Sequence, residues 1–146
     1  MKFILEGDPI PQCRHRTFRR KGKNINYDPN ASHKNQVKMI MGRILMNDPY
    51  LPYKDFYHVS LIFWFSIPKN DSKAKREAKL NGLIKCTNKF DLDNLEKGVL
   101  DSMTGALFSD DKKVVKLQSE KRWAERGYTE IEINGFNHER SDGRGN

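Results

Sequence analysis

Residues 57–67 read Y-H-V-S-L-I-F-W-F-S-I and carry the most regular apolar pattern in this chain of 146 residues. Alternate side chains of a β-strand point to the same face. The residues that share one face here are Val59, Leu61, Phe63, Phe65 and Ile67. Ile62 and Trp64 make much of the other face apolar as well. A strand that is apolar on both faces is expected at the centre of a sheet and covered twice, with a partner subunit as one source of cover.

The segments around this strand have apolar patterns that are either helical or shorter in extent. Residues 31–47 carry apolar side chains at helical spacing, so a helix that packs on the sheet is expected there, with a dimer face as the alternative. A lysine-rich helix is expected at 70–80, a first strand at 3–6, and two closing strands near 114–117 and 128–133, around a turn near Gly127. These elements predict a single small α+β domain with a mixed or antiparallel sheet and two to three helices; residues 136–146 are expected to form a disordered polar tail.

The composition points to a polyanionic partner. The formal net charge is +8 and the sequence pI is about 9.5, which favours DNA or RNA over an anionic membrane. No apolar run approaches the length of a membrane span, and the start lacks a signal-peptide stretch. Cys13 and Cys86 have no metal-ligand spacing and are interpreted as free thiols of a reducing cytoplasm. The four histidines form no zinc motif.

Two basic segments are candidates for phosphate contact. The first lies within residues 14–23 and is predicted to be a mobile loop; its candidate DNA-binding residues are Arg14, Arg16, Arg19 and Arg20. The second lies on the helix at 70–80, where the candidates are Lys73, Lys75 and Arg76, and where Lys79 adds to the basic surface. Arginine binds phosphate bidentately, and such contacts position nucleic acid without reading its sequence. The alternative for each segment is a solvated run of charge.

An acidic stretch stands out against this basic background. Residues 89–111 read K-F-D-L-D-N-L-E-K-G-V-L-D-S-M-T-G-A-L-F-S-D-D and contain Asp91, Asp93, Glu96, Asp101, Asp110 and Asp111. Two carboxylates about 4 Å apart repel by roughly 4 kcal/mol at an effective dielectric constant near 20, and a divalent cation relieves that repulsion. The stretch therefore predicts a metal site.

The spacing within the stretch indicates how such a site is built. Leu92, Leu95, Val99 and Met103 form one apolar stripe of a helix. Asp91 and Asp93 then lie at the exposed start of this helix, and Lys97 lies one turn after Asp93. Asp110 and Asp111 follow Gly105 in a predicted turn that could swing back to the helix start.

Ordinary structural roles are the alternative for each of these acids. Asp93 with Glu96 resembles a capping box. Asp93 with Lys97, and Lys97 with Asp101, are i,i+4 pairs worth a few tenths of a kcal/mol each. Asp101 is expected to pair with Lys97 or the helix rather than with a metal ion. Asp110 and Asp111 before two lysines suit a turn.

Taken together, these motifs resemble the RusA family of Holliday junction resolvases. Residues 89–95 are similar to its K-P-D-x-D-N-L, residues 101–105 to its D-A-L-x-G, and residues 110–114 to its D-D-x-x-V. Residues 7–16 resemble its G-x-P-x-P…R-x-R segment, and residues 67–76 its P…S-K-K-K-R segment. Phe90 replaces the usual proline, Ser102 and Met103 replace alanine and leucine, and Lys113 replaces glutamine.

The resemblance implies a homodimeric endonuclease, closely packed or intertwined, that cuts four-way DNA junctions in recombination and repair. It implies Mg²⁺ as cofactor, with Mn²⁺ as a substitute, and a bacterial, phage or prophage origin. It also implies a family domain over residues 1–135. The catalytic set that it implies is Asp91, Asp93, Lys97 and Asp111, of which the three aspartates hold the metal.

The chemistry agrees with these residue types. A metal held by the aspartates polarises the phosphoryl oxygen and lowers the pKa of a bound water, and Lys97 is expected to stabilise charge on the phosphate. Two alternatives remain open. Residues 111–113 give a weak match to a PD-(D/E)xK nuclease, and a non-catalytic basic nucleic-acid-binding protein would use the acids only to cap and solvate helices.

Overall fold

The computed structural model describes residues 1–13 and 16–140. In these ranges the chain forms one α+β domain with three α-helices and a four-stranded mixed sheet, as the sequence predicts. The sheet order is β1 (Lys2–Glu6), β6 (Tyr128–Phe136), β4 (Phe56–Ser66), β5 (Val114–Ala124). The helices are α1 (Ala31–Asn47), α2 (Lys73–Leu80) and α3 (Leu92–Met103), and two 3-10 turns cover Leu51–Tyr53 and Asp111–Lys113.

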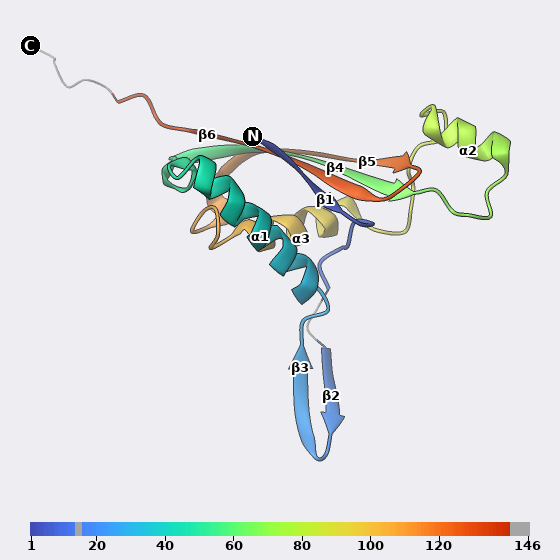
Figure 1. Ribbon diagram of the computed structural model, residues 1–146, viewed down its shortest axis with the longest axis horizontal. Coiled ribbons are helices and arrows are strands. Elements are labelled where there is room, and N and C mark those ends of the chain that lie inside the picture. Colours follow the sequence, from blue (N-terminus) through green and yellow to red (C-terminus); the bar gives the residue numbers. More distant parts are fainter. Residues whose placement is uncertain (14–15, 141–146) are drawn as a thin grey trace, which may run out of the picture.

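Strand β4 is the central strand of the sheet. It pairs antiparallel with β6 and parallel with β5, so the two closing strands lie on either side of it and do not pair with each other. Its alternate residues are buried, from Tyr57 to Phe65. They pack against α1 and α3, which lie on one side of the sheet (Figure 1). The apolar period of residues 57–67 therefore decides where the core lies.

The expected second cover of β4 does not come from the part of the chain that the structure describes. Helix α2 lies beyond one end of the sheet, and no described helix covers the face opposite α1 and α3 (Figure 1). Ile62 and Trp64 on that face are half-buried. Trp64 stacks on Tyr128 of the neighbouring strand, with ring centroids 5.5 Å apart, so cross-strand contacts account for part of its apolar character.

The basic segment predicted as a loop is a β-hairpin instead. β2 (Arg16–Arg20) pairs antiparallel with β3 (Lys23–Tyr27), and the hairpin projects away from the body of the molecule (Figure 1). Lys21 and Gly22 both have positive φ, of 49° and 77°, as the two-residue turn of a type I′ hairpin requires. The prediction was wrong because it weighed the charges of the segment and not this turn.

The C-terminal boundary stays a prediction. β6 ends at Phe136, and the backbone amide of His138 donates to the Asp55 carboxylate over 2.9 Å. Residues 141–146 of the predicted tail lie outside the described residues.

Candidate metal centre and nucleic-acid interface

Asp91 and Asp93 lie at the N-terminal end of α3, as the sequence predicts. Asp91 is the N-cap residue, with extended backbone angles, and its carbonyl accepts the amide of Leu95 over 3.2 Å. Leu95, Val99 and Met103 are fully buried against the sheet and α1, so the apolar stripe holds the helix down. The polar face is turned outward: Asp91, Asp93 and Lys97 are all exposed.

The capping hydrogen bonds and ion pairs that would give these two acids an ordinary structural role are absent from the described part of the chain. The Asp91 side chain makes no capping hydrogen bond. Glu96, the partner that a capping box requires, instead accepts a hydrogen bond from the Ser119 hydroxyl of β5. Among the described residues no ion pair joins Lys97 to Asp93 or Asp101. Two carboxylates at a helix N-terminus are thus free to bind something else.

The segment that leads into Asp91 is held near the end of β4. The ring of Phe90 contacts the ring of Phe65, with centroids 6.0 Å apart. The Lys121 ammonium donates to the carbonyl oxygens of Phe90 and Asn88 over 2.8 and 3.2 Å. These contacts position the start of α3 beside the second half of β5.

Asp111 lies near the opposite end of β4, where that strand begins. The preceding turn is anchored by Phe108, whose ring lies 5.4 Å from that of Tyr57 at the beginning of β4. Val114, just after Asp111, pairs with the same Tyr57. Tyr57 and Phe65 are eight strand residues apart, or about 26 Å at about 3.3 Å per residue. The turn therefore does not swing back to the helix start.

This separation divides the predicted ligands into two places. Within the described ranges, no group of three or more His, Cys, Asp or Glu side chains is close enough to hold a metal ion. Asp91 and Asp93 lie at one end of α3 and Asp111 beyond the other end. The ligand set that the sequence predicts thus stays a prediction, and one chain by itself does not assemble it in this conformation.

Asp110 has a local structural role that distinguishes it from Asp111. Its carboxylate accepts the backbone amide of Lys112 over 2.9 Å and so caps the short turn at Asp111–Lys113. This hydrogen bond, followed by a hydrogen bond with the neighbouring Asp111 side chain, lowers the pKa of Asp110 below its ordinary value. Asp111 itself is exposed.

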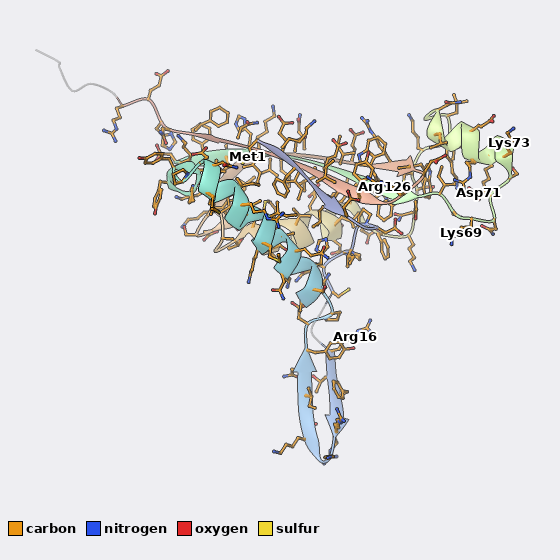
Figure 2. All side chains as sticks on the ribbon, viewed as in Figure 1. Met1, Arg16, Lys69, Asp71, Lys73 and Arg126 are labelled. Carbon is orange, nitrogen blue, oxygen red and sulfur yellow. The ribbon has the colours of Figure 1, made fainter. Side chains whose placement is uncertain are left out.

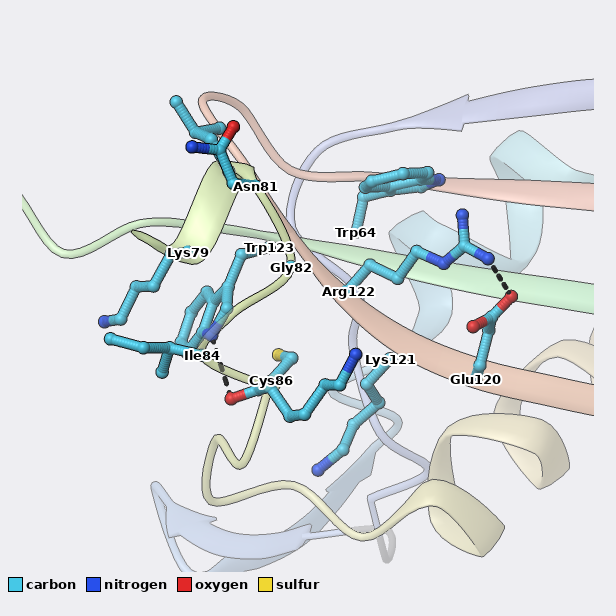
Figure 3. Close-up of a pocket in the computed structure, with 12 residues that line it drawn as sticks. Trp64, Lys79, Asn81, Gly82, Ile84, Cys86, Glu120, Lys121, Arg122 and Trp123 are labelled. Carbon is cyan, nitrogen blue, oxygen red and sulfur yellow. Dashed lines mark hydrogen bonds and ion pairs between the residues drawn. The ribbon is translucent and has the colours of Figure 1, made fainter. Parts of the chain in front are cut away.

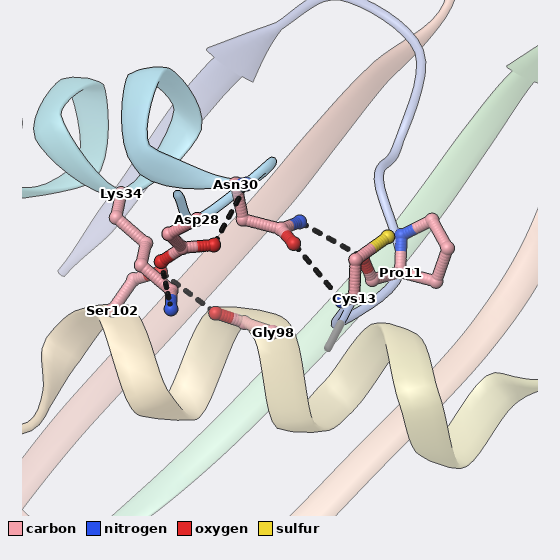
Figure 4. A network of polar contacts seen from close by, with 7 residues as sticks. All are labelled: Pro11, Cys13, Asp28, Asn30, Lys34, Gly98 and Ser102. Atoms are coloured by element: carbon pink, nitrogen blue, oxygen red, sulfur yellow. Dashed lines mark hydrogen bonds and ion pairs between the residues drawn. The ribbon is translucent and has the colours of Figure 1, made fainter. Parts of the chain in front are cut away.

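The basic hairpin is fixed to α3 at its root. The Asn30 side chain donates to the carbonyl of Pro11 over 2.8 Å and accepts the amide of Cys13 over 2.9 Å, which ties the two ends of the hairpin together (Figure 4). The Gln12 amide donates to the carbonyl of Asn94 over 3.0 Å. The hairpin therefore starts beside the first turns of α3.

Gly98 makes this close approach possible. A Cβ atom at Gly98 would lie 3.3 Å from the Gln12 nitrogen and 3.4 Å from the Ile10 oxygen. A glycine inside a helical pattern is a signal for such backbone contact. Sequence reasoning missed this signal, and with it the positioning roles of Gln12, Asn30 and Lys121, which depend on contacts between distant parts of the chain.

The predicted DNA-binding residues lie on the two projecting elements. Arg16, Arg19 and Arg20 are exposed on β2, and Figure 2 shows Arg16 where the hairpin leaves the body. Arg14 lies outside the described residues. On α2, Lys73 and Lys75 are exposed and Arg76 is half-buried. The start of α3 lies between the hairpin and α2 (Figure 1).

Lys79 does not belong to the basic surface, contrary to the prediction. Only 7% of its side chain is exposed, and its ammonium pairs with Asp71 and lies 4.3 Å from the centre of the Trp123 ring. The Trp123 indole donates to the carbonyl of Lys85 over 3.1 Å (Figure 3). Lys79 thus docks α2 onto β5.

The cavity in Figure 3 has a structural explanation. It lies between the end of α2 and β5, with a volume of about 330 Å³, and four cations line it. Three of them already have partners: Lys79 has Asp71, Lys121 has the Phe90 carbonyl, and Arg122 has Glu120 at 2.6 Å. These contacts serve to hold α2 and the segment before Asp91 in place.

Comparison with known proteins connects this geometry to a family. Residues 6–134 match the family described as "Endodeoxyribonuclease RusA". The chain is also 31% identical over 137 residues to the "Uncharacterized protein YqaN" of Bacillus subtilis (strain 168). The aligned region covers 91% of this chain and 94% of that protein. None of the helices in the described ranges has the length and hydropathy that a membrane crossing requires.

Proposed function

Because the chain belongs to the RusA family of endodeoxyribonucleases, we propose that it is a divalent-metal-dependent nuclease that resolves four-way DNA junctions in recombination and repair. The observation that carries the proposal is the pair Asp91 and Asp93. Both carboxylates are exposed at the start of α3, none of the described residues bonds to them, and two basic elements flank them.

The donor set fits a hard cation. Mg²⁺ prefers oxygen ligands, retains several waters, and needs only one or two protein carboxylates. Asp91 and Asp93 would hold it, with Asp111 as a third ligand. When bound, the metal supplies charge neutralisation at the phosphate and a water of lowered pKa. The exposure of both carboxylates also leaves room for a DNA phosphate beside them.

The other residues bind and orient the DNA. Lys97 lies one helical turn from Asp93 on the same exposed face, where its ammonium would offset the charge that develops on the phosphate. The arginines of β2 and the lysines of α2 would hold the backbone on the two sides of the acids. This arrangement explains how a polyanion approaches a pair of carboxylates.

We place Asp111 in the site of a second copy of the chain. A two-fold axis between two copies of α3 would bring the Asp91–Asp93 end of one copy beside the Asp111 end of the other. The separation of about 26 Å between the two anchoring positions on β4 supports this arrangement, because it keeps the three acids apart within one chain. Such a homodimer presents two sites to two strands of a junction.

Cleavage of a synthetic four-way junction with one labelled strand tests the function. We expect the wild type to cut paired strands in Mg²⁺ or Mn²⁺ and not in EDTA, and Asp93→Asn to lose cleavage by at least about 100-fold while still binding the junction. Glu125→Gln, which changes an exposed acid in the loop before β6, is the matched control and should cut normally. If the wild type binds but cuts no DNA in either metal, the protein is a non-catalytic binding module.

Complementation between two inactive variants tests the position of Asp111. If the site is shared, a mixture of Asp93→Asn and Asp111→Asn should recover activity, because each mixed dimer has one site with both native acids. Random mixing makes half of the dimers mixed, so about one quarter of the wild-type sites are intact. If each site is built within one chain, every site carries a substitution and the mixture stays inactive.

A further inference from the structure

The two faces of the basic hairpin differ in chemistry. Side chains directly opposite each other on β2 and β3 share a face. One face carries the pairs Arg16/Tyr27, Phe18/Ile25 and Arg20/Lys23. The other carries the polar pairs Thr17/Asn26 and Arg19/Asn24, and the Thr17 hydroxyl donates to the Asn26 side chain.

The first face, here called the aromatic face, has no cover among the described residues. The exposed fractions are 45% for Phe18, 37% for Ile25 and 42% for Tyr27. The Phe18 and Tyr27 rings touch edge to face, with centroids 5.7 Å apart, and form one apolar patch. An isolated two-stranded hairpin is at best marginally stable in water, so this patch would gain from a partner.

The charges select the partner. Residues 16–27 contain five Lys or Arg residues and no Asp or Glu. Arg16, Arg20 and Lys23 lie on the aromatic face itself, at both ends of the rings. A second copy of a chain with net charge +8 is a poor electrostatic match for such a surface. Nucleic acid is complementary to both features of this face, because its phosphates pair with the cations and its bases stack on the rings.

We infer that the aromatic face of the hairpin, through Phe18 and Tyr27, stacks on the base faces exposed at a DNA branch point and so distinguishes branched from linear DNA. This inference rests on the proposed function. In a continuous duplex each base is covered by its neighbours, whereas a branch interrupts the stack. The hairpin root is fixed to α3 through Gln12 and Asn94, so the stacking contact also sets the position of the cut strand relative to Asp91 and Asp93.

The test uses a synthetic four-way junction with 2-aminopurine at the branch and a linear duplex of the same sequence, both in EDTA. The wild type should change the fluorescence of the branch-point base and should bind the junction more tightly than the duplex. Phe18→Leu combined with Tyr27→Leu keeps apolar bulk and removes the rings. It should abolish the fluorescence change and weaken junction binding by about tenfold, with duplex binding unchanged.

Two controls separate stacking from folding. Asn24→Ala changes the opposite face and should behave as the wild type. Phe18→Trp keeps a ring on the aromatic face and should keep the fluorescence change, which a merely misfolded hairpin would not. The inference is overturned if the double leucine variant keeps the wild-type preference for junctions, or if it turns a dimer into a monomer without DNA, since the patch would then contact a second copy.

The outcome is independent of catalysis. A wild type that changes the branch-point fluorescence but cuts nothing in Mg²⁺ refutes the nuclease function and leaves the stacking contact standing. A wild type that cuts junctions, beside a double leucine variant with unchanged junction preference, refutes the stacking contact alone.

Discussion

The backbone amide of Gln12 donates a hydrogen bond to the carbonyl of Asn94 over 3.0 Å, and this bond joins the root of the basic hairpin to the helix that begins at Asp91 and Asp93. A flexible arm would find DNA without fixing where it is cut. An arm tied to α3 relates the position of the bound backbone to that of the acids.

Gly98→Ala should disturb this link. The added Cβ would lie 3.3 Å from the Gln12 nitrogen, and a hydrogen bond to the Asn94 carbonyl holds that nitrogen against α3. Overpacking costs about 1–3 kcal/mol, whereas alanine in place of glycine inside a helix gains at most about 1 kcal/mol. We expect a net loss of about 1 kcal/mol in the free energy of unfolding, measured by urea denaturation, together with weaker junction binding.

Gly42→Ala in α1 is the matched control for that experiment. Nothing lies within 4 Å of its added Cβ, so only the gain in helix propensity remains, and the free energy of unfolding should rise by about 0.5–1 kcal/mol. Equal stabilisation by both substitutions would show that the hairpin root does not pack tightly on α3.

Arg19→Ala and Arg20→Ala should act through phosphate contact. Each should weaken binding to junction and duplex alike, and should reduce the slope of log affinity against log salt by about 0.9 per lost contact. Arg43→Ala, an exposed arginine of α1 outside both basic elements, should leave the slope unchanged. If both hairpin variants keep the wild-type salt slope, these arginines of the hairpin do not contact DNA phosphates.

The ion pair that docks α2 should make stability depend on pH in the acid range. The Lys79 ammonium donates a hydrogen bond to Asp71, and this bond, with the charges of Lys79, Lys75 and Arg76, lowers the pKa of Asp71 below its ordinary value of 3.8. The contribution is therefore fully present above pH 3.8 and is lost as the pH falls through the lowered pKa.

Thermal unfolding of Asp71→Asn between pH 6 and pH 2 measures this contribution. The wild type should be the more stable protein at pH 6, and the difference should shrink steadily below pH 3.8. A difference that is the same at both ends of the range would mean that the Asp71 carboxylate does not stabilise the fold through its charge.

Gly127→Ala should be the most damaging of these substitutions. A Cβ at Gly127 would lie 1.8 Å from Oδ1 and 2.6 Å from Cα of Asp8, so the clash involves backbone and cannot be relieved by a side-chain rotation. Asp8 is itself held by the amide and hydroxyl of Ser66, over 3.1 and 2.9 Å. We expect a loss of at least about 3 kcal/mol in the free energy of unfolding, or failure to fold, measured by circular dichroism and denaturation.

Much of the local structure could be predicted from the chain. The helical period of residues 31–47 matches α1 at both ends, and the apolar alternation of residues 57–67 matches β4 within one residue at each end. Ser72 caps α2 by accepting the Lys75 amide over 3.3 Å, and serine is a favoured residue at this position of a helix. In each case the signal lies within a few neighbouring residues, because backbone geometry and side-chain period are local properties.

The hairpin shows where local interpretation failed. Its charges suggested a loop, but the Lys21–Gly22 turn and the pairing of Phe18 with Ile25 make two strands. The turn signal was in the sequence. The pairing became evident only when both strands were considered together.

The sequence by itself determined every helix and strand of the body outside the hairpin, the acidic start of α3, the basic segments that flank it and the family to which the chain belongs. Only the tertiary structure decided that β5 and β6 lie on opposite sides of β4, that Lys79 is buried in a docking contact, and that Asp111 lies at the far end of α3 from Asp91. The reason is physical. The period of the side chains depends on residues a few positions apart. The place where a turn packs against the sheet depends on contacts between residues far apart in the chain, such as Phe90 with Phe65 and Phe108 with Tyr57.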